Sequence, residues 1–414
     1  MTIIEFYDKA SIENVLGALM CRPERMILVG DRPKQMERSC ERYGRVLSQR
    51  GITTEIACRA VATRNSLQAI TDVLSQIAQE YDDCVFDLTG GEDLYLVAVG
   101  IVMERYAGRV QCQRFNIRND TVTDCDADGI VCRVDSFDIS VEENINIYGG
   151  EVVTEAERAV HTCPWTLDGD PANDVYKMWD ICRKNSRLWN AHISTLGTVC
   201  RIFGFEGDDA LDISYDRRTA ENEIKRLGHK YVCVAWIMRE LEQHGLIHGL
   251  RLDDTVSFRF DNAQIKRCLT VAGQVLELAV ACRMLALKDK DGSPLYHDVR
   301  VGVVIDWDGE DDTDEYRTVN EIDVMAMKGS VPIFISCKNG DLDANELYKL
   351  NTVAERFGNK YAKRVLVCTE LEKLGSKAEY LRARMDDMGI RKVENIDDMG
   401  DVEFDRVLRS LWFN

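Results

Sequence analysis

Short apolar runs alternate with amphipathic segments throughout residues 1–150. The apolar runs predict buried strands over residues 26–30, 52–58, 84–88 and 110–117. Between them, apolar side chains recur at helical spacing and predict helices over residues 34–50, 67–81 and 94–106. Strands that alternate with helices of this length are typical of a parallel sheet with helices on both faces. We therefore expect residues 1–150 to form an α/β domain.

The pattern changes between residues 151 and 262, where the segments 175–189 and 220–244 have helical spacing with interspersed Lys and Arg. Gly245 ends the second segment, and residues 248–260 predict a hairpin that turns at Asp253 and Asp254. A helix followed by a hairpin is the outline of a winged helix, and it is also the outline of many connecting segments. We expect a mainly helical connector here, and both interpretations stay open.

Residues 263–414 begin with a long predicted helix over residues 264–287. The segments that follow predict three strands (299–307, 321–327 and 332–338), a helix (345–357), a strand (364–368) and a last helix (376–388). The predicted order of elements in this third domain is therefore α-β-β-β-α-β.

The chain has 414 residues, with 52 Lys and Arg against 71 Asp and Glu, which gives a net charge of −19. This length is enough for two or three domains, each with its own core. The negative charge weighs against a protein that coats nucleic acid, because phosphate binding needs positive surface. A local basic cleft is still compatible with this composition.

The 15 cysteines include no CxxC pair, so they indicate reduced, mostly buried thiols rather than zinc or disulfide sites. No stretch approaches the roughly 20 apolar residues of a membrane span. The start of the chain lacks the basic and then apolar order of a signal peptide. We therefore expect a cytoplasmic protein that does not associate with a membrane.

Two loops at the carboxyl ends of predicted strands are candidate ligand sites, namely Gly30–Pro33 and Asp87–Glu92. Ligands of open α/β sheets bind outside the strand carboxyl ends, where helix N-termini meet phosphate groups. Thr89 could cap a helix or donate to an oxygen, while Gly90 and Gly91 allow close approach. A tight turn without a ligand explains the same residues. Since GxxxxGK[ST] and GxGxxG are both absent, we expect no ordinary ATP or NAD binding.

Residues 20–125 resemble a CARF domain, the sensor fold of CRISPR-associated accessory proteins, and Asp87–Gly91 is the clearest mark. The resemblance implies a homodimer that binds cyclic oligoadenylate across its two-fold axis. It implies ligand contacts by Gly30, Asp31, Thr89, Gly90 and Gly91, and we add Arg32 and Glu92 of the same loops as candidate ligand residues.

Glu92 and Asp93 depart from the family pattern, which often has Thr-Lys after the two glycines. Because a carboxylate repels phosphate, we expect Glu92 to face an adenine or a ribose hydroxyl. The positive charge for the phosphates could come from Arg32, Lys34, Arg59 or Arg64.

The third domain holds the strongest chemical signal, in the two predicted strands around Asp323 and Lys338. We expect these two side chains to share one edge of the sheet, with Glu277 of the preceding helix leaning toward it. Carboxylates hold Mg²⁺ or Mn²⁺, and a lysine can orient water and stabilise charge on a scissile phosphate. Taken singly, Asp323 could be a turn residue and Lys338 a solvated edge residue.

This arrangement resembles the PD-(D/E)xK nuclease superfamily, whose restriction-endonuclease-like core has the same α-β-β-β-α-β order. The resemblance implies that Asp323 binds metal, that Lys338 is the terminal lysine and that Glu277 is the acid of the first helix. Ser336 stands where the family has an acid two residues before the lysine. Glu277, Glu321 or Glu346 could supply the missing oxygen, and the candidate metal ligands are Asp323, Glu277 and Glu346.

A CARF-like sensor followed by such a nuclease is the layout of CRISPR type III ancillary nucleases. These resemblances imply a homodimeric endonuclease that depends on Mn²⁺ or Mg²⁺ and cleaves DNA, RNA or both in antiviral defence. Cyclic tetra-adenylate is the expected allosteric activator, because its two-fold symmetry suits a dimer pocket. Cyclic hexa-adenylate has that symmetry too.

Two alternatives stay open. In the first, Ser336 marks an inactive nuclease, and a winged helix within residues 220–262 binds promoter DNA in response to the messenger. In the second, the first domain is a ring nuclease that degrades the cyclic messenger itself.

Overall fold

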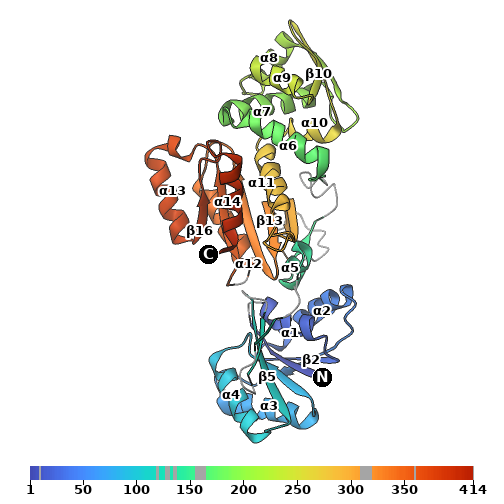
Figure 1. Ribbon diagram of the computed structural model, residues 1–414, viewed down its shortest axis with the longest axis vertical. Coiled ribbons are helices and arrows are strands. Elements are labelled where there is room, and N and C mark those ends of the chain that lie inside the picture. Colours follow the sequence, from blue (N-terminus) through green and yellow to red (C-terminus); the bar gives the residue numbers. More distant parts are fainter. Residues whose placement is uncertain are drawn as a thin grey trace.

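The computed structural model describes residues 1–8, 11–117, 121–125, 131–133, 138–153, 165–307, 319–358 and 360–413. It shows a mixed α/β protein whose three parts follow one another along the longest axis (Figure 1). A seven-stranded sheet lies at one end, a six-stranded sheet in the middle and a three-stranded sheet at the other end. Within the described ranges, no helix is long and apolar enough to cross a membrane. The fold class predicted from the sequence is confirmed.

The first sheet has the strand order β3-β2-β1-β4-β5-β6-β7. Its strands are β1 (Thr2–Phe6), β2 (Arg25–Gly30), β3 (Glu55–Ala60), β4 (Cys84–Asp87), β5 (Val110–Asn116), β6 (Thr121–Asp124) and β7 (Val131–Arg133). Strands β1 to β5 pair in parallel, and β6 and β7 add an antiparallel edge. The helices of this part are α1 (Leu16–Cys21), α2 (Pro33–Gln49), α3 (Leu67–Glu80) and α4 (Asp93–Arg105).

Strand β1 was missed in the sequence, so 26–30 is the second strand and not the first. All five β1 residues are buried, but Thr2 and Glu5 interrupt the apolar run that would have marked a strand. The strand lies in the middle of the sheet, where Phe6 pairs with Val29 of β2 and Ile4 pairs with Phe86 of β4. The carboxyl ends of these three strands therefore meet at one edge of the sheet.

The part farthest from this sheet contains the helices α6 (Gly169–Cys182), α7 (Ser186–Ile202), α8 (Arg217–Arg226) and α9 (Ala235–Gln243) and the strands β9 (Asp212–Asp216), β10 (Ile247–Leu252) and β11 (Thr255–Phe260). The predicted hairpin is present as β10 and β11. Both predicted helices were wrong in extent. The first is divided before Asn185, whose side chain caps α7, and the second is divided near Gly228, which has a φ of +80°.

The middle part is built on a sheet with the strand order β16-β15-β14-β13-β12-β8. Its strands are β8 (Glu151–Val152), β12 (Asp298–Asp306), β13 (Val319–Lys328), β14 (Val331–Lys338), β15 (Lys363–Cys368) and β16 (Ile390–Val393). Its helices are α5 (Val141–Ile147), α11 (Gln274–Ala286), α12 (Ala344–Phe357), α13 (Ser376–Asp387) and α14 (Asp401–Ser410), whereas α10 (Ala263–Cys268) packs against α6 and β11 of the part farthest from the first sheet.

The long helix predicted over residues 264–287 is two helices, α10 and α11. Gly273 precedes α11 with a φ of +93°, a backbone conformation that glycine adopts without strain and that ends a continuous helix. This break places Glu277 in the first turn of α11 rather than in the middle of a long helix.

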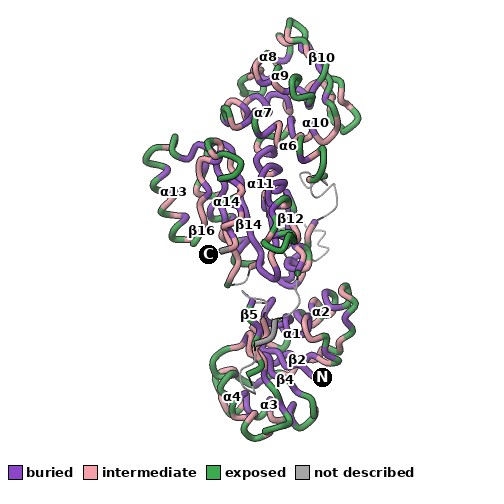
Figure 2. Tube along the Cα trace, viewed as in Figure 1, coloured by how far each residue is buried: buried purple, intermediate pink, exposed green. Residues whose placement is uncertain are grey.

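The six-stranded sheet is covered on both faces by cores that extend into the neighbouring parts. The part farthest from the first sheet, from α6 to α10, is called the far module below. One core joins Ile333 and Ile335 to α11 and to helices of the far module, while the other joins Phe334 to α12 and to residues of the first sheet. Buried chain accordingly runs through the middle part in Figure 2. The boundary expected at residue 150 falls within the segment 138–153, whose elements α5 and β8 pack with this sheet.

Candidate functional sites

Asp323 is held in place where the pairing of β13 and β14 ends, at Val324 and Ile335. Beyond this point, an Asp323 carboxylate oxygen accepts the Cys337 backbone N–H at 2.6 Å. The same oxygen, Oδ2, accepts from the Ser336 hydroxyl at 3.1 Å. The two strands thus hold Asp323 in one place, and Ser336 donates to that acid instead of supplying a second one.

Lys338 lies at the end of β14, where its Nζ is 3.0 Å from a Glu346 carboxylate oxygen at the start of α12. Lys349, one turn further along α12, also contacts Glu346, at 3.3 Å. Burial lowers the pKa of Lys338, but the negative charges of Asp323 and Glu346 outweigh this effect and raise the pKa above its ordinary value. Lys338 is therefore a fixed positive charge at neutral pH and not a proton acceptor.

Glu277 reaches the same place from α11, and its carboxylate accepts from the Gln274 side chain at 3.0 Å. Burial, followed by the negative charges of Asp323 and Glu321, raises the pKa of Glu277 to about 8. Burial also raises the pKa of Asp323, although Lys338 and the Cys337 N–H oppose that shift. We call Glu277, Asp323, Ser336, Lys338 and Glu346 the carboxylate–lysine cluster.

The cluster brings together the residues that the sequence pattern singled out, with Glu321 nearby and exposed on β13. Among the described residues, no three Asp, Glu, His or Cys side chains converge closely enough to enclose a metal ion. The donor chemistry nevertheless suits Mg²⁺ or Mn²⁺, because the acids are oxygen ligands and the raised pKa values of Glu277 and Asp323 show that burial disfavours their ionised forms when no cation is bound. A bound cation would stabilise both carboxylates in their ionised form.

A second candidate site lies where β1, β2 and β4 end. It is a pocket of about 260 Å³ lined by Tyr7, Asp8, Asp31, Arg32, Arg64, Glu92 and Tyr95, and we call it the loop pocket. Three of the seven predicted ligand residues, Asp31, Arg32 and Glu92, thus line one cavity.

The charged side chains of the loop pocket are paired with one another. Arg64 contacts Glu92 at 2.5 Å and Asp31 at 3.8 Å, and Arg32 lies 4.0 Å from Asp31. Two of the four candidate sources of positive charge, Arg32 and Arg64, therefore face the pocket, whereas Arg59 pairs with Glu80. An anionic ligand would compete with Asp31 and Glu92 for the two guanidinium groups.

The other predicted ligand residues shape the loops behind the pocket. A Cβ at Gly91, whose φ is +98°, would lie 2.9 Å from the Phe6 Cβ, and a Cβ at Gly30 would lie 2.8 Å from the Tyr7 Cβ. Gly90 is buried, with the Glu13 side chain 3.3 Å from where a Cβ would be. These glycines are thus required by the close approach of β1 as much as by any ligand.

Thr89 and Asp87 tie the second loop to the sheet. The Thr89 hydroxyl accepts the Phe115 N–H at 2.8 Å, and the Asp87 carboxylate accepts the Thr89 N–H at 2.8 Å. The Thr89 side chain also hydrogen-bonds to the Asp87 carboxylate, which opposes the rise that burial causes in the pKa of Asp87.

Sequence reasoning missed three residues of the loop pocket, namely Tyr7, Asp8 and Tyr95. The first two directly follow β1, so recognising that strand would have pointed to them. Tyr95 comes three residues after Glu92 and shares its side of α4, a spacing that was available as a signal. Burial raises the pKa of Tyr95 to about 12, so its hydroxyl remains a hydrogen-bond donor.

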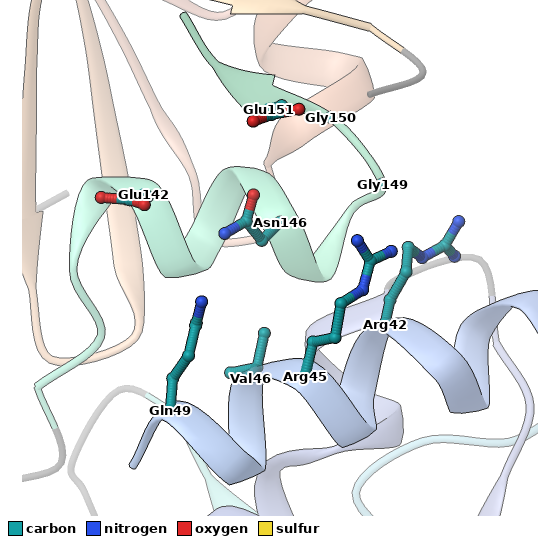
Figure 3. A pocket seen from close by; sticks show the side chains of 9 residues that line it. All are labelled: Arg42, Arg45, Val46, Gln49, Glu142, Asn146, Gly149, Gly150 and Glu151. Carbon is teal, nitrogen blue, oxygen red and sulfur yellow. The ribbon is translucent and has the colours of Figure 1, made fainter. Parts of the chain in front are cut away.

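A third cavity, of about 200 Å³, lies between α2 and the turn that follows α5. Figure 3 shows Arg42 and Arg45 rising from α2 toward Gly149, with Glu142 and Asn146 of α5 on the opposite side. Next to it, Arg50 at the end of α2 makes a bidentate ion pair with Glu143 of α5, at 2.6 and 2.7 Å. Helix α2 thus runs from the loop pocket to helix α5, which packs against the six-stranded sheet.

The comparisons with known proteins came from solved structures, since no family model and no curated protein matches the chain. Protein VC1899 from Vibrio cholerae is 17% identical, with a TM-score of 0.72 over 99% of this chain and 97% of that chain. Can2 from Sulfobacillus thermosulfidooxidans, solved in complex with cyclic tetra-adenylate, is 14% identical, with a TM-score of 0.63 over 99% and 97% of the two chains. At these identities the likeness shows a common fold over essentially the whole chain.

Proposed function

We propose that this protein is a metal-dependent nuclease that is activated by a cyclic oligoadenylate in CRISPR-linked antiviral defence. The observation that carries the proposal is the carboxylate–lysine cluster, where Lys338 is held charged between Asp323 and Glu346 beside a protonatable Glu277. The whole-length fold shared with Can2, which was solved with cyclic tetra-adenylate, supports it. We keep the predicted division into a sensor (1–150), a connector (151–262) and a nuclease (263–414), with α5 and β8 at the first boundary packed against the nuclease sheet.

In this proposal, Asp323, Glu277 and Glu346 hold Mg²⁺ or Mn²⁺, with Glu321 as a further candidate. The cation would polarise a phosphate oxygen and increase the acidity of water. Lys338 stabilises the negative charge that develops on the scissile phosphate, since its raised pKa keeps it protonated. Ser336 orients Asp323 by donating to its Oδ2. To bind the cation, the Glu346 carboxylate would have to weaken its ion pair with Lys338. Lys338 would then be available to contact the substrate phosphate.

The loop pocket is the proposed activator site. Arg32 and Arg64 would contact phosphates, and Asp31 or Glu92, once released by Arg64, would accept from ribose hydroxyl or adenine amino groups. The first residue of α2, Pro33, directly follows Arg32, so the positive end of that helix also faces the pocket. Cyclic tetra-adenylate is the proposed ring, because the Can2 structure contains it.

A homodimer is the proposed active form, with α4 at its interface. Helix α4 begins next to Glu92, and Leu94, Leu96 and Val97 are exposed by 36%, 39% and 50%. A Cβ at Gly100 of the same helix would meet no atom within 4 Å, so this surface is uncovered in the single chain. Packing two α4 helices together would cover these side chains and place two loop pockets side by side.

The proposal is tested by incubating labelled single- and double-stranded DNA and RNA with Mg²⁺ or Mn²⁺, with and without cyclic tetra-adenylate. Lys338→Ala is the test variant, and Lys349→Ala is the matched control because it removes the more exposed lysine that contacts Glu346. We expect cleavage that needs the messenger and is lost in Lys338→Ala but kept in Lys349→Ala. Messenger binding without cleavage under either metal would contradict the proposal, and so would cleavage that survives Lys338→Ala.

A messenger-responsive DNA-binding regulator is the second candidate function, favoured by the order of elements in the far module. That order is a helix, a strand, two helices and a hairpin, with β9 and β10 on either side of β11. Promoter binding by a protein that never cleaves nucleic acid would favour this candidate. Loss of the messenger itself, unaffected by Lys338→Ala, would instead indicate a ring nuclease.

A further inference from the structure

The far module has the complete topology of a winged helix. Helix α7 leads into β9, the helices α8 and α9 follow, and the hairpin of β10 and β11 closes a three-stranded antiparallel sheet in which β11 pairs with β9. In helix-turn-helix proteins of this kind, the second helix of the pair enters the major groove and the first crosses the backbone. Here α9 is the helix at that position and α8 precedes it. Topology alone does not identify a ligand. Whether α8 and α9 could bind DNA therefore depends on the charges that these two helices expose.

The charge of this module departs from that of the rest of the chain. Residues 217–260 contain eight Lys and Arg against six Asp and Glu, in a protein with a net charge of −19. Three of the four acids of α8 and α9 are engaged, and the fourth, Glu221 of α8, is exposed. Glu223 pairs with Arg226 at 2.8 Å, Glu240 pairs with Lys184 at 2.6 Å, and Glu242 accepts the Leu250 N–H at 2.8 Å. Since α8 and α9 together carry five Lys and Arg against four acids, and Lys184 from outside the pair offsets Glu240, the remaining charge of the two helices is positive.

Four cations of the helix pair are exposed and make no ion pair with any residue that the structure describes. They lie at the start of α8, at its end, in the connection to α9 and in the middle of α9: Arg218, Lys225, Lys230 and Arg239. The first turn of α9 has no side-chain cap, so its backbone N–H groups add to the positive field there. Ala235 in that turn is exposed and small enough for close approach.

We propose that the face formed by α8 and α9 binds double-stranded DNA and holds it for the nuclease, an inference that rests on the proposed function. The duplex lies against the helices rather than the tip of the hairpin, because Asp253 and Asp254 are exposed at that tip and would repel phosphate. The contacts are to the backbone, so binding depends strongly on salt and weakly on sequence.

A close packing contact also connects the module to the helix that carries Glu277 of the cluster. Helix α7 packs so closely on the turn between α10 and α11 that a Cβ at Gly197 would lie 2.2 Å from the Thr270 carbonyl oxygen. Helix α11 starts four residues later at Gln274 and carries Glu277 of the cluster in its first turn. Figure 1 shows α11 running from the module along the six-stranded sheet. A duplex held by α9 is therefore linked to the acids through one helix and one close packing contact.

The test uses the full chain with Lys338→Ala in EDTA, so that binding is measured without cleavage. Fluorescence anisotropy with a labelled DNA duplex is compared between this background, Lys230→Ala plus Arg239→Ala, and Lys377→Ala. The last is the matched control, since Lys377 is an exposed lysine of α13, outside the proposed face. We expect the double variant to bind about tenfold more weakly for each charge removed, with the slope of log K against log salt reduced by about 2. The control should leave both quantities unchanged.

Equal binding by the double variant and the background would overturn the inference, and so would preferred binding of single strands or of RNA duplexes. Cleavage by the chain with Lys338 intact separates this inference from the proposed function. Weakened binding in the double variant, with no cleavage by the intact chain under either metal, would overturn the nuclease but support the DNA-binding face. Cleavage that the double variant retains in full would support the nuclease and overturn the face.

Discussion

In the loop pocket, the ion pair between Arg64 and Glu92 is open to water, with the two side chains 42% and 50% exposed. In the carboxylate–lysine cluster, the pair between Lys338 and Glu346 is more covered, at 26% and 28%. Burial shifts the pKa values of the cluster residues, and Glu277 reaches about 8. An exposed pair is screened and can be exchanged for a ligand at little cost, whereas a covered one sets the charge on which chemistry depends. The exposed ion pair is therefore typical of a ligand-binding site, at the edge of the seven-stranded sheet. The covered ion pair is typical of a reaction site, in the six-stranded sheet.

Removing the charge of Asp323 is expected to give the largest effect. Asp323→Asn keeps the shape of the side chain but removes the negative charge beside Lys338, so we expect cleavage to fall about 10²- to 10³-fold. Single-turnover cleavage with saturating messenger measures this loss. Asp341→Asn is the control, because Asp341 is an exposed acid just beyond β14 that contacts the exposed Arg187 at 3.4 Å. Cleavage that is equal in the two variants would show that Asp323 has no part in the reaction.

The raised pKa of Glu277 predicts that stability without metal depends on pH. The folded protein binds a proton at Glu277 up to about pH 8, whereas an unfolded glutamate releases it near its ordinary pKa of 4.5. The folded state thus binds more protons between these values, and the free energy of unfolding should fall as pH rises from about 4.5 to 8.

The expected fall is on the order of a few kcal/mol, measured from denaturant midpoints in EDTA. Glu277→Gln should flatten the profile, and Mg²⁺ should restore stability at pH 8 by binding the ionised acid. The metal-dependent cleavage rate should rise over the same pH range, because proton and cation compete for Glu277. A flat profile for the unmodified chain would contradict the placement of Glu277 against the other acids.

Gly91→Ala tests the packing behind the loop pocket. The new Cβ would lie 2.9 Å from the Phe6 Cβ at a φ of +98°, so we expect a loss of about 2 kcal/mol in the free energy of unfolding. Gly108→Ala is the matched control, since its φ is +81° but its Cβ would meet no atom within 4 Å. The difference between the two variants isolates the steric contact from the backbone strain. Equal losses would mean that β1 yields to the new methyl group.

Breaking the exposed pair should have the smallest effect on stability. Arg64→Ala is expected to change the free energy of unfolding by less than about 1 kcal/mol, because both partners are exposed. The same variant should weaken the binding of cyclic tetra-adenylate by about tenfold or more, through loss of a charge-assisted contact to phosphate. Calorimetric titration measures the affinity, with Arg59→Ala as an exposed control that pairs with Glu80. Equal affinities for the two variants would place the activator elsewhere.

Local pattern was enough to predict most elements of both large sheets. Apolar runs followed by glycine identified β2, β4 and β14 to within a residue or two. The consecutive residues of these strands are mostly apolar, so the strands are visible in the sequence alone. The failures were at glycines such as Gly228 and Gly273, where the helical pattern continues across a break. The prediction missed strand β1 for a different reason. Glu5 is buried in this strand, although a glutamate normally indicates an exposed position.

The sequence by itself determined the α/β alternation, the two loops at strand ends and the presence of an acid and a lysine on neighbouring strands. Only the tertiary structure decided that Ser336 donates to Asp323, that Glu346 pairs with Lys338 and that Tyr7 and Tyr95 line one pocket with Arg64. The physical reason is the sequence separation over which each effect acts. Periodicity and turn chemistry act over a few residues, whereas burial, pKa and ion pairing depend on which distant segments exclude water from one another.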